Sequence, residues 1–106
     1  MRTLEIYRKG ILAGLLIEEN RKKYIFRYDE KYFIDDHYPA ISLTLPKTQK
    51  EYISEFLFPF FFNMLSEGVN RKLQSVQLKI DEEDNFGLLA ATAQYDTIGA
   101  ITVNPI

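Results

Sequence analysis

Few residues in this chain could support metal chemistry. Its one histidine, His37, follows two acids, Asp35 and Asp36. An imidazole beside carboxylates could form one corner of a metal site, but a structural zinc site needs four ligands. The chain has no cysteine and no second histidine to complete such a set. We therefore expect no metal site.

Sequence signatures of catalysis are also missing. The chain contains no G-x-G-x-x-G motif, no phosphate-binding loop and no G-x-S-x-G nucleophile turn. General acid–base catalysis needs a pair of positioned groups, and the acids occur only as neighbours in polar runs such as 81–84. We therefore expect no catalytic residue, no cofactor and no enzymatic activity. The remaining class is a module that works by contact with a partner.

One aromatic row could bind single-stranded nucleic acid. Tyr24, Phe26 and Tyr28 alternate along a predicted strand, so their rings lie on one face and could stack bases. The alternative is a sheet face that packs on helices. The net charge is −2, divided into about +2 for residues 1–53 and −4 for residues 54–106. Because nucleic-acid binders usually present a basic face, the charge favours the packed sheet and no direct nucleic-acid contact.

The stretch "PFFFNMLSEG", residues 59–68, combines strongly apolar and polar residues. Pro59 suits the first turn of a helix, where its missing N–H is not needed, and Gly68 suits the position just after a helix. The apolar part predicts a core helix ending near Ser66. The polar part predicts an exposed turn before the next helix, and exposed turns often carry binding residues.

Period-two alternation predicts strands at 3–8, 11–19 and 23–29. Lys9 and Gly10 form a suitable hairpin turn, and Gly14 is a candidate for a bulge. These three strands form an antiparallel meander. A further short strand, or an extended segment on the sheet edge, is predicted at 41–46, and a last strand at 98–106.

Apolar residues at helical spacing occur in the part of the sequence between these strands and the last one. Helices are predicted at 59–66, at 69–78 and after Asp81, which could cap the third helix. The fold class is therefore α+β: a small antiparallel sheet, made of the N-terminal meander and the C-terminal strand, packed against about three short helices in a single domain over 1–106. Truncation of a core side chain to Ala should cost ~2–5 kcal/mol. The expected core positions on the helices are Phe60, Met64, Leu73 and Leu89.

Composition also bears on the cellular compartment. The chain is 46% hydrophobic, which is enough for a core, yet no apolar run is long enough for a signal sequence or a membrane span. The absence of cysteine agrees with a reducing environment. We expect a soluble, cytoplasmic protein.

Five motifs in order resemble the N-terminal segment of HipA-type serine/threonine kinases, the toxins of bacterial toxin–antitoxin modules. "PFFFNMLSEG" is similar to the family's P-F-F-x-N-L-L-P-E-G, except that Ser66 replaces the proline. "LEIYRKGILAGLL" resembles its N-terminal hairpin, "YIFRYDEKYF" the following strand and "AISLTLP" its P-L-S-x-S-L-P. "EEDNFGLLAATAQYDTIGAITV" resembles the C-terminal motif, with Gln94 in place of a glycine.

The resemblance implies a function by contact. A complete kinase of the family continues beyond this lobe with its nucleotide site and catalytic Asp. The chain is similar to the small, separately encoded HipS type, which implies an antitoxin subunit that binds a HipT-like kinase in trans and inhibits it, in modules that also hold a HipB-like DNA-binding protein. The alternative is an accessory lobe that stabilises the kinase and bridges it to the DNA-binding partner without inhibition.

The exposed turn and the first turn of the next helix are the expected kinase contact. Glu67 is the candidate for a polar contact, Val69 for an apolar plug, and Gly68 for the backbone shape. An ordinary interhelical turn, with Val69 packing beneath the next helix, is the alternative. The predicted partner-binding residues are Ser66, Glu67, Gly68, Val69, Asn70 and Arg71.

Overall fold

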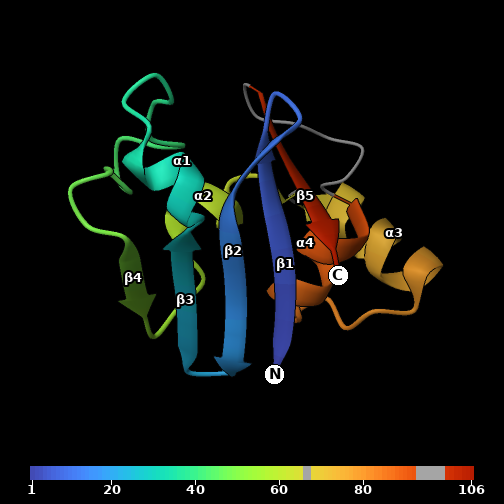
Figure 1. The fold of residues 1–106 in the computed structure, drawn as a ribbon. Helices are drawn as coiled ribbons and strands as arrows, with labels where there is room; N and C mark the ends of the chain where they lie inside the picture. The colour runs from blue at the N-terminus through green and yellow to red at the C-terminus, as the bar shows by residue number, and fades with distance from the viewer. Residues whose placement is uncertain (66–67, 93–99) are drawn as a thin grey trace.

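The computed structural model describes residues 1–65, 68–92 and 100–106, and for residues 68, 69 and 92 only the course of the backbone. These residues form one five-stranded sheet and four short helices, joined by turns and loops (Figure 1). In chain order the elements are β1 (Arg2–Arg8), β2 (Ile11–Asn20), β3 (Lys23–Tyr28), α1 (Glu30–Ile34), β4 (Glu51–Ser54), α2 (Pro59–Phe62), α3 (Gly68–Leu78), α4 (Asn85–Thr92) and β5 (Ile101–Pro105).

The sheet is antiparallel throughout, with the strand order β4-β3-β2-β1-β5. The predicted meander forms its centre, and the C-terminal strand pairs with β1, so the α+β class is confirmed. In Figure 1 the helices α2, α3 and α4 lie behind the sheet, with α4 behind β5 and α3 at the periphery of this layer. No helix among the described residues is long and apolar enough to cross a membrane.

The first hairpin forms as the sequence predicts. Lys9 and Gly10 both have positive φ, 51° and 79°, which is the conformation of the tight turn whose twist matches two antiparallel strands. The register between β1 and β2 then shifts, because Ile6 pairs with Gly14 and Tyr7 with Leu12. The bulge thus lies immediately before Gly14. A Cβ at Gly14 would stand 2.4 Å from the carbonyl oxygen of Arg27, so β3 can approach β2 closely only at a glycine.

The aromatic row of β3 belongs to the core. Tyr24, Phe26 and Tyr28 are buried on the face of the sheet that the helices cover, and Phe26 packs on Phe61 of α2. The favoured interpretation of this row, a sheet face packed on helices, is confirmed, and its alternative, base stacking, is excluded because a ring enclosed in a core cannot stack on a base. The largest fully buried side chains of this core are Tyr28, Tyr32, Phe26, Phe61, Phe86, Leu4, Ile6, Leu16, Leu45, Leu88, Leu89 and Val103.

The strand predicted at 41–46 is absent, and this segment forms turns. Its alternation is nevertheless real, because Ile41 and Leu45 are buried and Leu43 is fully exposed. Tyr28 holds the segment to the sheet: its hydroxyl donates to the carbonyl of Leu45 and accepts from the N–H of Ile41 at 3.1 Å. The edge of the sheet is occupied instead by β4, which pairs with β3.

Replacing Tyr28 by Phe should release this segment. Burial raises the pKa of Tyr28 to about 12, so its hydroxyl remains a donor at ordinary pH. Its loss leaves the carbonyl of Leu45 and the N–H of Ile41 without this partner, at a cost of ~1–3 kcal/mol. Urea unfolding measures the effect. Tyr7→Phe, at a half-buried hydroxyl, is the control, and equal stabilities of the two variants would contradict this role.

The helices differ from prediction in their ends. Pro59 occupies the first turn of α2 as expected, but α2 is a single turn. Gly68 begins α3, so its predicted role just after a helix was wrong. Asp84 caps α4, accepting the N–H of Gly87 at 3.1 Å, whereas Asp81 accepts the N–H of Glu83 in the preceding loop.

Three of the four predicted core positions contact the core. Leu89 is fully buried, and Phe60 and Met64 are partly buried against the same cluster. Leu73 is exposed on α3, so its assignment to the core was wrong. The segment 30–34, for which the sequence predicts no helix, forms the short helix α1.

Candidate partner-binding surface

The one histidine lies at the surface. Its ring Nδ1 is 2.9 Å from a carboxylate oxygen of Asp35, which also accepts the backbone N–H of His37 at 2.9 Å. The backbone hydrogen bond is the main cause of a lowered pKa at Asp35. Within residues 1–65, 68–92 and 100–106, no three His, Cys, Asp or Glu side chains are grouped so that they could hold a metal ion.

The side of α3 that faces the domain is polar. Arg71 reaches from α3 to the loop before α4, donating from Nε and Nη2 to the carbonyl of Glu82 at 3.0 and 2.8 Å and also to the side-chain oxygen of Asn85. Its guanidinium lies 5.7 Å from the ring centre of Phe62. One turn further on, the hydroxyl of Ser75 donates to the carbonyl of Ile80. These contacts fix α3 against the rest of the molecule.

The end of α3 is also fixed by the backbone. The N–H of Ile80 donates to the carbonyl of Ser75 at 3.0 Å, and Lys79 has a φ of 57°. This is the arrangement in which a left-handed residue closes a helix, here with a lysine where glycine is usual. The orientation of α3 is therefore set at both ends, by Arg71 and by this cap.

The side of α3 that faces away from the domain is apolar. Leu73 is 53% exposed and Val76 is 72% exposed. Val69 precedes Leu73 by four residues, which is the spacing of one helical stripe. We call Leu73 and Val76 the α3 face. An amphipathic helix normally turns its apolar stripe to the core. Here the polar side makes the internal contacts, and Leu73 and Val76 are not covered by the chain's own core.

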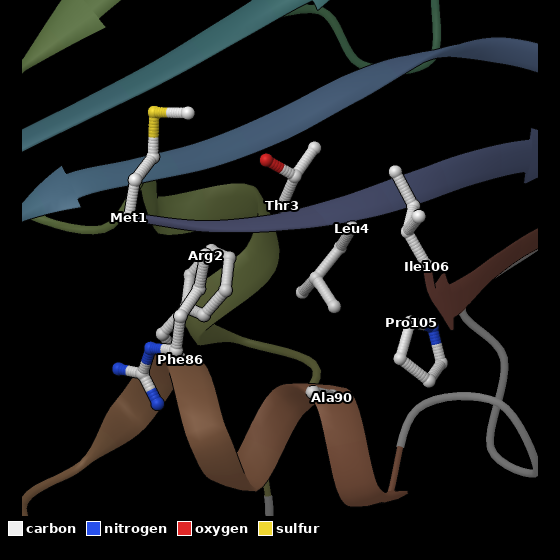
Figure 2. A pocket seen from close by; sticks show the side chains of 8 residues that line it. All are labelled: Met1, Arg2, Thr3, Leu4, Phe86, Ala90, Pro105 and Ile106. Atoms are coloured by element: carbon white, nitrogen blue, oxygen red, sulfur yellow. The ribbon is translucent and has the colours of Figure 1, made fainter.

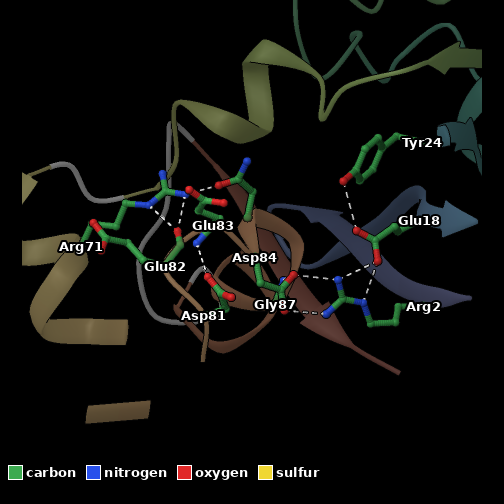
Figure 3. A network of polar contacts seen from close by, with 10 residues as sticks. Arg2, Glu18, Tyr24, Arg71, Asp81, Glu82, Glu83, Asp84 and Gly87 are labelled. Carbon is green, nitrogen blue, oxygen red and sulfur yellow. Dashed lines mark hydrogen bonds and ion pairs between the residues drawn. The ribbon is translucent and has the colours of Figure 1, made fainter. Parts of the chain in front are cut away.

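A second polar network joins the sheet to the loop 81–84 (Figure 3). Arg2, Glu18 and Tyr24 stand opposite one another on β1, β2 and β3. Glu18, a buried acid, accepts from Arg2 at 2.6 and 2.8 Å and from the Tyr24 hydroxyl at 3.1 Å. Arg2 also donates to both carboxylate oxygens of Asp84, at 2.7 and 3.0 Å.

The acidic loop is thus held by two arginines. Arg2 binds its last residue, Asp84, from the sheet, while Arg71 binds the carbonyl of Glu82 from α3. The hydrogen bonds from Arg2 are the largest cause of a lowered pKa at Asp84. Since Asp84 also caps α4, one side chain connects the strands, the loop and this helix. The other three acids of the run "DEED" are exposed, so the loop is solvated and is anchored through Asp84 and the carbonyl of Glu82.

The lowered pKa of Asp84 predicts a pH-dependent effect of Asp84→Asn. A depressed carboxyl pKa adds stability above the unfolded-state pKa of ~3.9, and this stability is lost as the pH falls through the folded-state value. The variant should therefore be less stable than the parent at pH 7, and the difference should shrink towards pH 3. Urea unfolding at both pH values measures it. Asp36→Asn is the exposed control, and a difference that does not change with pH would contradict the ion pair's role.

The predicted partner-binding residues are placed only in part. Ser66 and Glu67 lie outside the described residues. Gly68 and Val69 are in the first turn of α3, where only the backbone is described, and Asn70 is exposed. Arg71 is half-buried and makes the contacts given above, so it positions the helix, and its contact with a partner stays a prediction.

Sequence reasoning missed Leu73 and Val76 as surface residues. The sequence-based prediction assigns Leu73 to the core and Val69 to the partner contact, and it gives no role to Val76. The residues that could have indicated the exposure of Leu73 and Val76 lie on the opposite side of the helix. Arg71 and Ser75 are four residues apart and share a face, and neither residue type is common in a core.

Two comparisons place the chain among known proteins. The family model described as "HipA N-terminal domain" matches residues 4–104, nearly the whole chain. An uncharacterized protein of Haemophilus influenzae (strain ATCC 51907 / DSM 11121 / KW20 / Rd) is 29% identical over 103 residues, which are 97% of this chain and 92% of that protein. The relative is thus scarcely longer than the matched domain. The chain belongs to the HipA N-terminal domain family.

Proposed function

We propose that the chain is an antitoxin subunit that binds a HipT-like serine/threonine kinase and inhibits it in trans. The observation that carries this proposal is the α3 face, an apolar helix surface that the domain's own core does not cover. Exposed apolar side chains gain about 1.5–3 kcal/mol each when a partner buries them fully. A surface of this kind is typical of a docking element.

The family supports a kinase as the partner. A HipA N-terminal domain is a non-catalytic region of HipA, where it lies before the rest of the protein. We infer that the surface by which this domain would contact the rest of HipA serves as the docking surface when the domain is a separate chain. The relative from Haemophilus influenzae supports an independent role, because the region that aligns with this chain makes up 92% of that protein. A kinase that lacks this domain would offer the complementary surface in trans.

Inhibition rests on the segment that leads into the α3 face. Ser66 and Glu67 directly precede Gly68, the first residue of α3, so docking through α3 brings them to the kinase surface. We propose that Glu67 supplies a polar contact and Val69 an apolar one near the kinase's nucleotide or substrate cleft. A HipB-like DNA-binding protein would complete a ternary complex, and direct contact of this chain with nucleic acid is not part of the proposal.

A kinase assay separates inhibition from the accessory role. A HipT-like kinase that lacks its own N-terminal domain, taken from the same genome, is incubated with ATP and increasing amounts of this chain, and autophosphorylation is followed. We expect the rate to fall to a plateau near zero at saturation. A rate that is unchanged or higher although the two proteins form a complex would instead establish the accessory lobe.

A further inference from the structure

The exposed side of α3 carries charge as well as apolar side chains. Lys72 precedes Val76 by one helical turn. Lys79 follows Val76 at the helix cap, where its backbone N–H donates to the carbonyl of Val76 at 3.4 Å. Both lysines are exposed, and within residues 1–65, 68–92 and 100–106 neither ammonium group makes an ion pair. Two unpaired cations therefore border the α3 face.

This charge lies on one flank of the α3 face. At 100° per residue, the opposite flank of the helix carries Asn70 and Gln77, which are exposed and uncharged. The sequence of α3 contains no acid. The acidic loop 81–84 lies against the side of α3 that faces the domain, where Arg71 binds the carbonyl of Glu82 (Figure 3). The α3 face is thus an apolar stripe between a basic flank and a neutral one.

Lys79 occupies a backbone position that disfavours a lysine. Its φ of 57° lies in the left-handed region, which glycine adopts without strain and other residues adopt rarely. Residues held in such conformations gather at functional sites. The side chain of Lys79 is not needed to close α3, so its ammonium group can serve a role at the surface.

A cavity beside α4 differs in this respect (Figure 2). It has a volume of about 400 Å³, and its apolar lining includes Leu4, Phe86 and Ala90. The guanidinium of Arg2 also lines it, 5.0 Å from the ring centre of Phe86, but makes hydrogen bonds to Glu18 and Asp84. The charge at this cavity is satisfied inside the domain, whereas the charges beside the α3 face are not.

Unpaired cations beside an apolar stripe indicate the chemistry of the surface that covers it. Protein interfaces place a positive patch opposite a negative one, and a cation buried without a partner weakens binding. We propose that the α3 face docks into an apolar groove that is bordered by carboxylates on the side of Lys72 and Lys79. This inference rests on the proposed function, because it takes the HipT-like kinase as the protein that provides the groove.

The composition of α3 favours a protein over an anionic membrane as the partner. Helices that lie in a membrane interface usually present Trp, Phe or Leu along a broad apolar side. The sequence of α3 contains no aromatic residue, and its outward side presents Leu73 and Val76. Two aliphatic side chains suit a groove on a protein.

Charge reversal tests the inference. The variant Lys72→Glu/Lys79→Glu is compared with Lys22→Glu/Lys31→Glu, which changes two exposed lysines outside α3 and alters the net charge equally. Binding to the purified kinase is followed by surface plasmon resonance at about 0.1 M and about 1 M salt, where the Debye length is about 10 Å and about 3 Å.

The two salt concentrations should give different results. At the lower one we expect the α3 variant to bind at least about thirtyfold more weakly than the parent, mainly through slower association, and the control to stay within about threefold of the parent. At the higher one screening should reduce the loss in the α3 variant to about fivefold or less.

A second variant separates the charge from the fold. Lys79→Gly keeps a residue that closes the helix in the left-handed conformation and removes the ammonium group. We expect a melting temperature equal to or above that of the parent, together with an affinity at least about threefold lower at the lower salt concentration. A lysine with a purely structural role would show no loss of affinity.

Other outcomes overturn the inference. If the parent binds the kinase but charge reversal costs no more than the control, or Lys79→Gly binds as tightly as the parent, the groove has no such carboxylates and the proposed function stands. If the parent does not bind the kinase, both proposals fail. Sedimentation with vesicles of phosphatidylserine and phosphatidylcholine is the third measurement. Binding of the parent that is lost in Lys72→Glu/Lys79→Glu would identify a membrane as the occupant and overturn the inference.

Discussion

Replacing Leu73 and Val76 together by aspartate is expected to abolish capture of the kinase and to leave the melting temperature of the free chain unchanged. Both side chains are largely exposed, at 53% and 72%, so their replacement removes little core packing. Surface substitutions of this kind usually change stability by no more than ~0.5 kcal/mol. The parent and the variant are compared by pull-down with the kinase, by rescue from kinase toxicity and by thermal melting.

The effect on binding should be large because an unpaired charge in a closed interface costs several kcal/mol. Each 1.4 kcal/mol is about tenfold in affinity, so a loss of at least ~100-fold is expected. The matched control changes Ile34 and Leu43, two exposed apolar residues outside α3, to aspartate. If both double variants are captured equally well, the α3 face is not the kinase-binding surface.

Truncating Phe61 to Ala should cause the largest loss of stability among the tests suggested by this fold. Phe61 is fully buried and its ring packs against those of Phe26, Phe58 and Phe60. Truncation of a buried Phe to Ala costs about 3–5 kcal/mol, which is a large part of the ~5–15 kcal/mol that stabilises a typical domain. Guanidinium unfolding measures the loss.

Phe56→Ala provides the control for Phe61→Ala. Phe56 has the same side chain five residues earlier and is 76% exposed, so its truncation should cost well under 1 kcal/mol. Similar losses for the two variants would show that α2 does not pack on the sheet as described.

The sheet could be predicted from the sequence where local patterns specify it. The alternation of β1, β2 and β3 and the turn at Lys9 and Gly10 are local features, and all are confirmed. Residues 41–46 alternate in the same way, but a strand also needs a neighbour to pair with. Tyr28 supplies side-chain hydrogen bonds to this segment instead, and β4 pairs with β3 to form the edge of the sheet. Such a competition between distant segments cannot be seen in a local pattern.

The α3 face was harder to predict than the sheet. An apolar stripe on a helix does not reveal whether the chain's own core or a partner covers it. The spacing of Leu73 and Val76 indicates an amphipathic helix, but it fits burial in the chain's own core or in a partner equally well. The decisive contact, from Arg71 to the carbonyl of Glu82, joins α3 to the loop before α4. It turns the apolar stripe outwards, and only the folded structure shows it. The cavity between Leu4, Phe86 and Ala90 is also formed by residues far apart in the sequence.

The most direct test of the central claim is calorimetric titration of the purified HipT-like kinase with this chain at two temperatures. If the chain docks through the α3 face, we expect saturable binding with a negative heat-capacity change, because burial of apolar surface gives that signature. The absence of saturable heat at both temperatures, with both proteins shown to be folded by circular dichroism, would contradict the account.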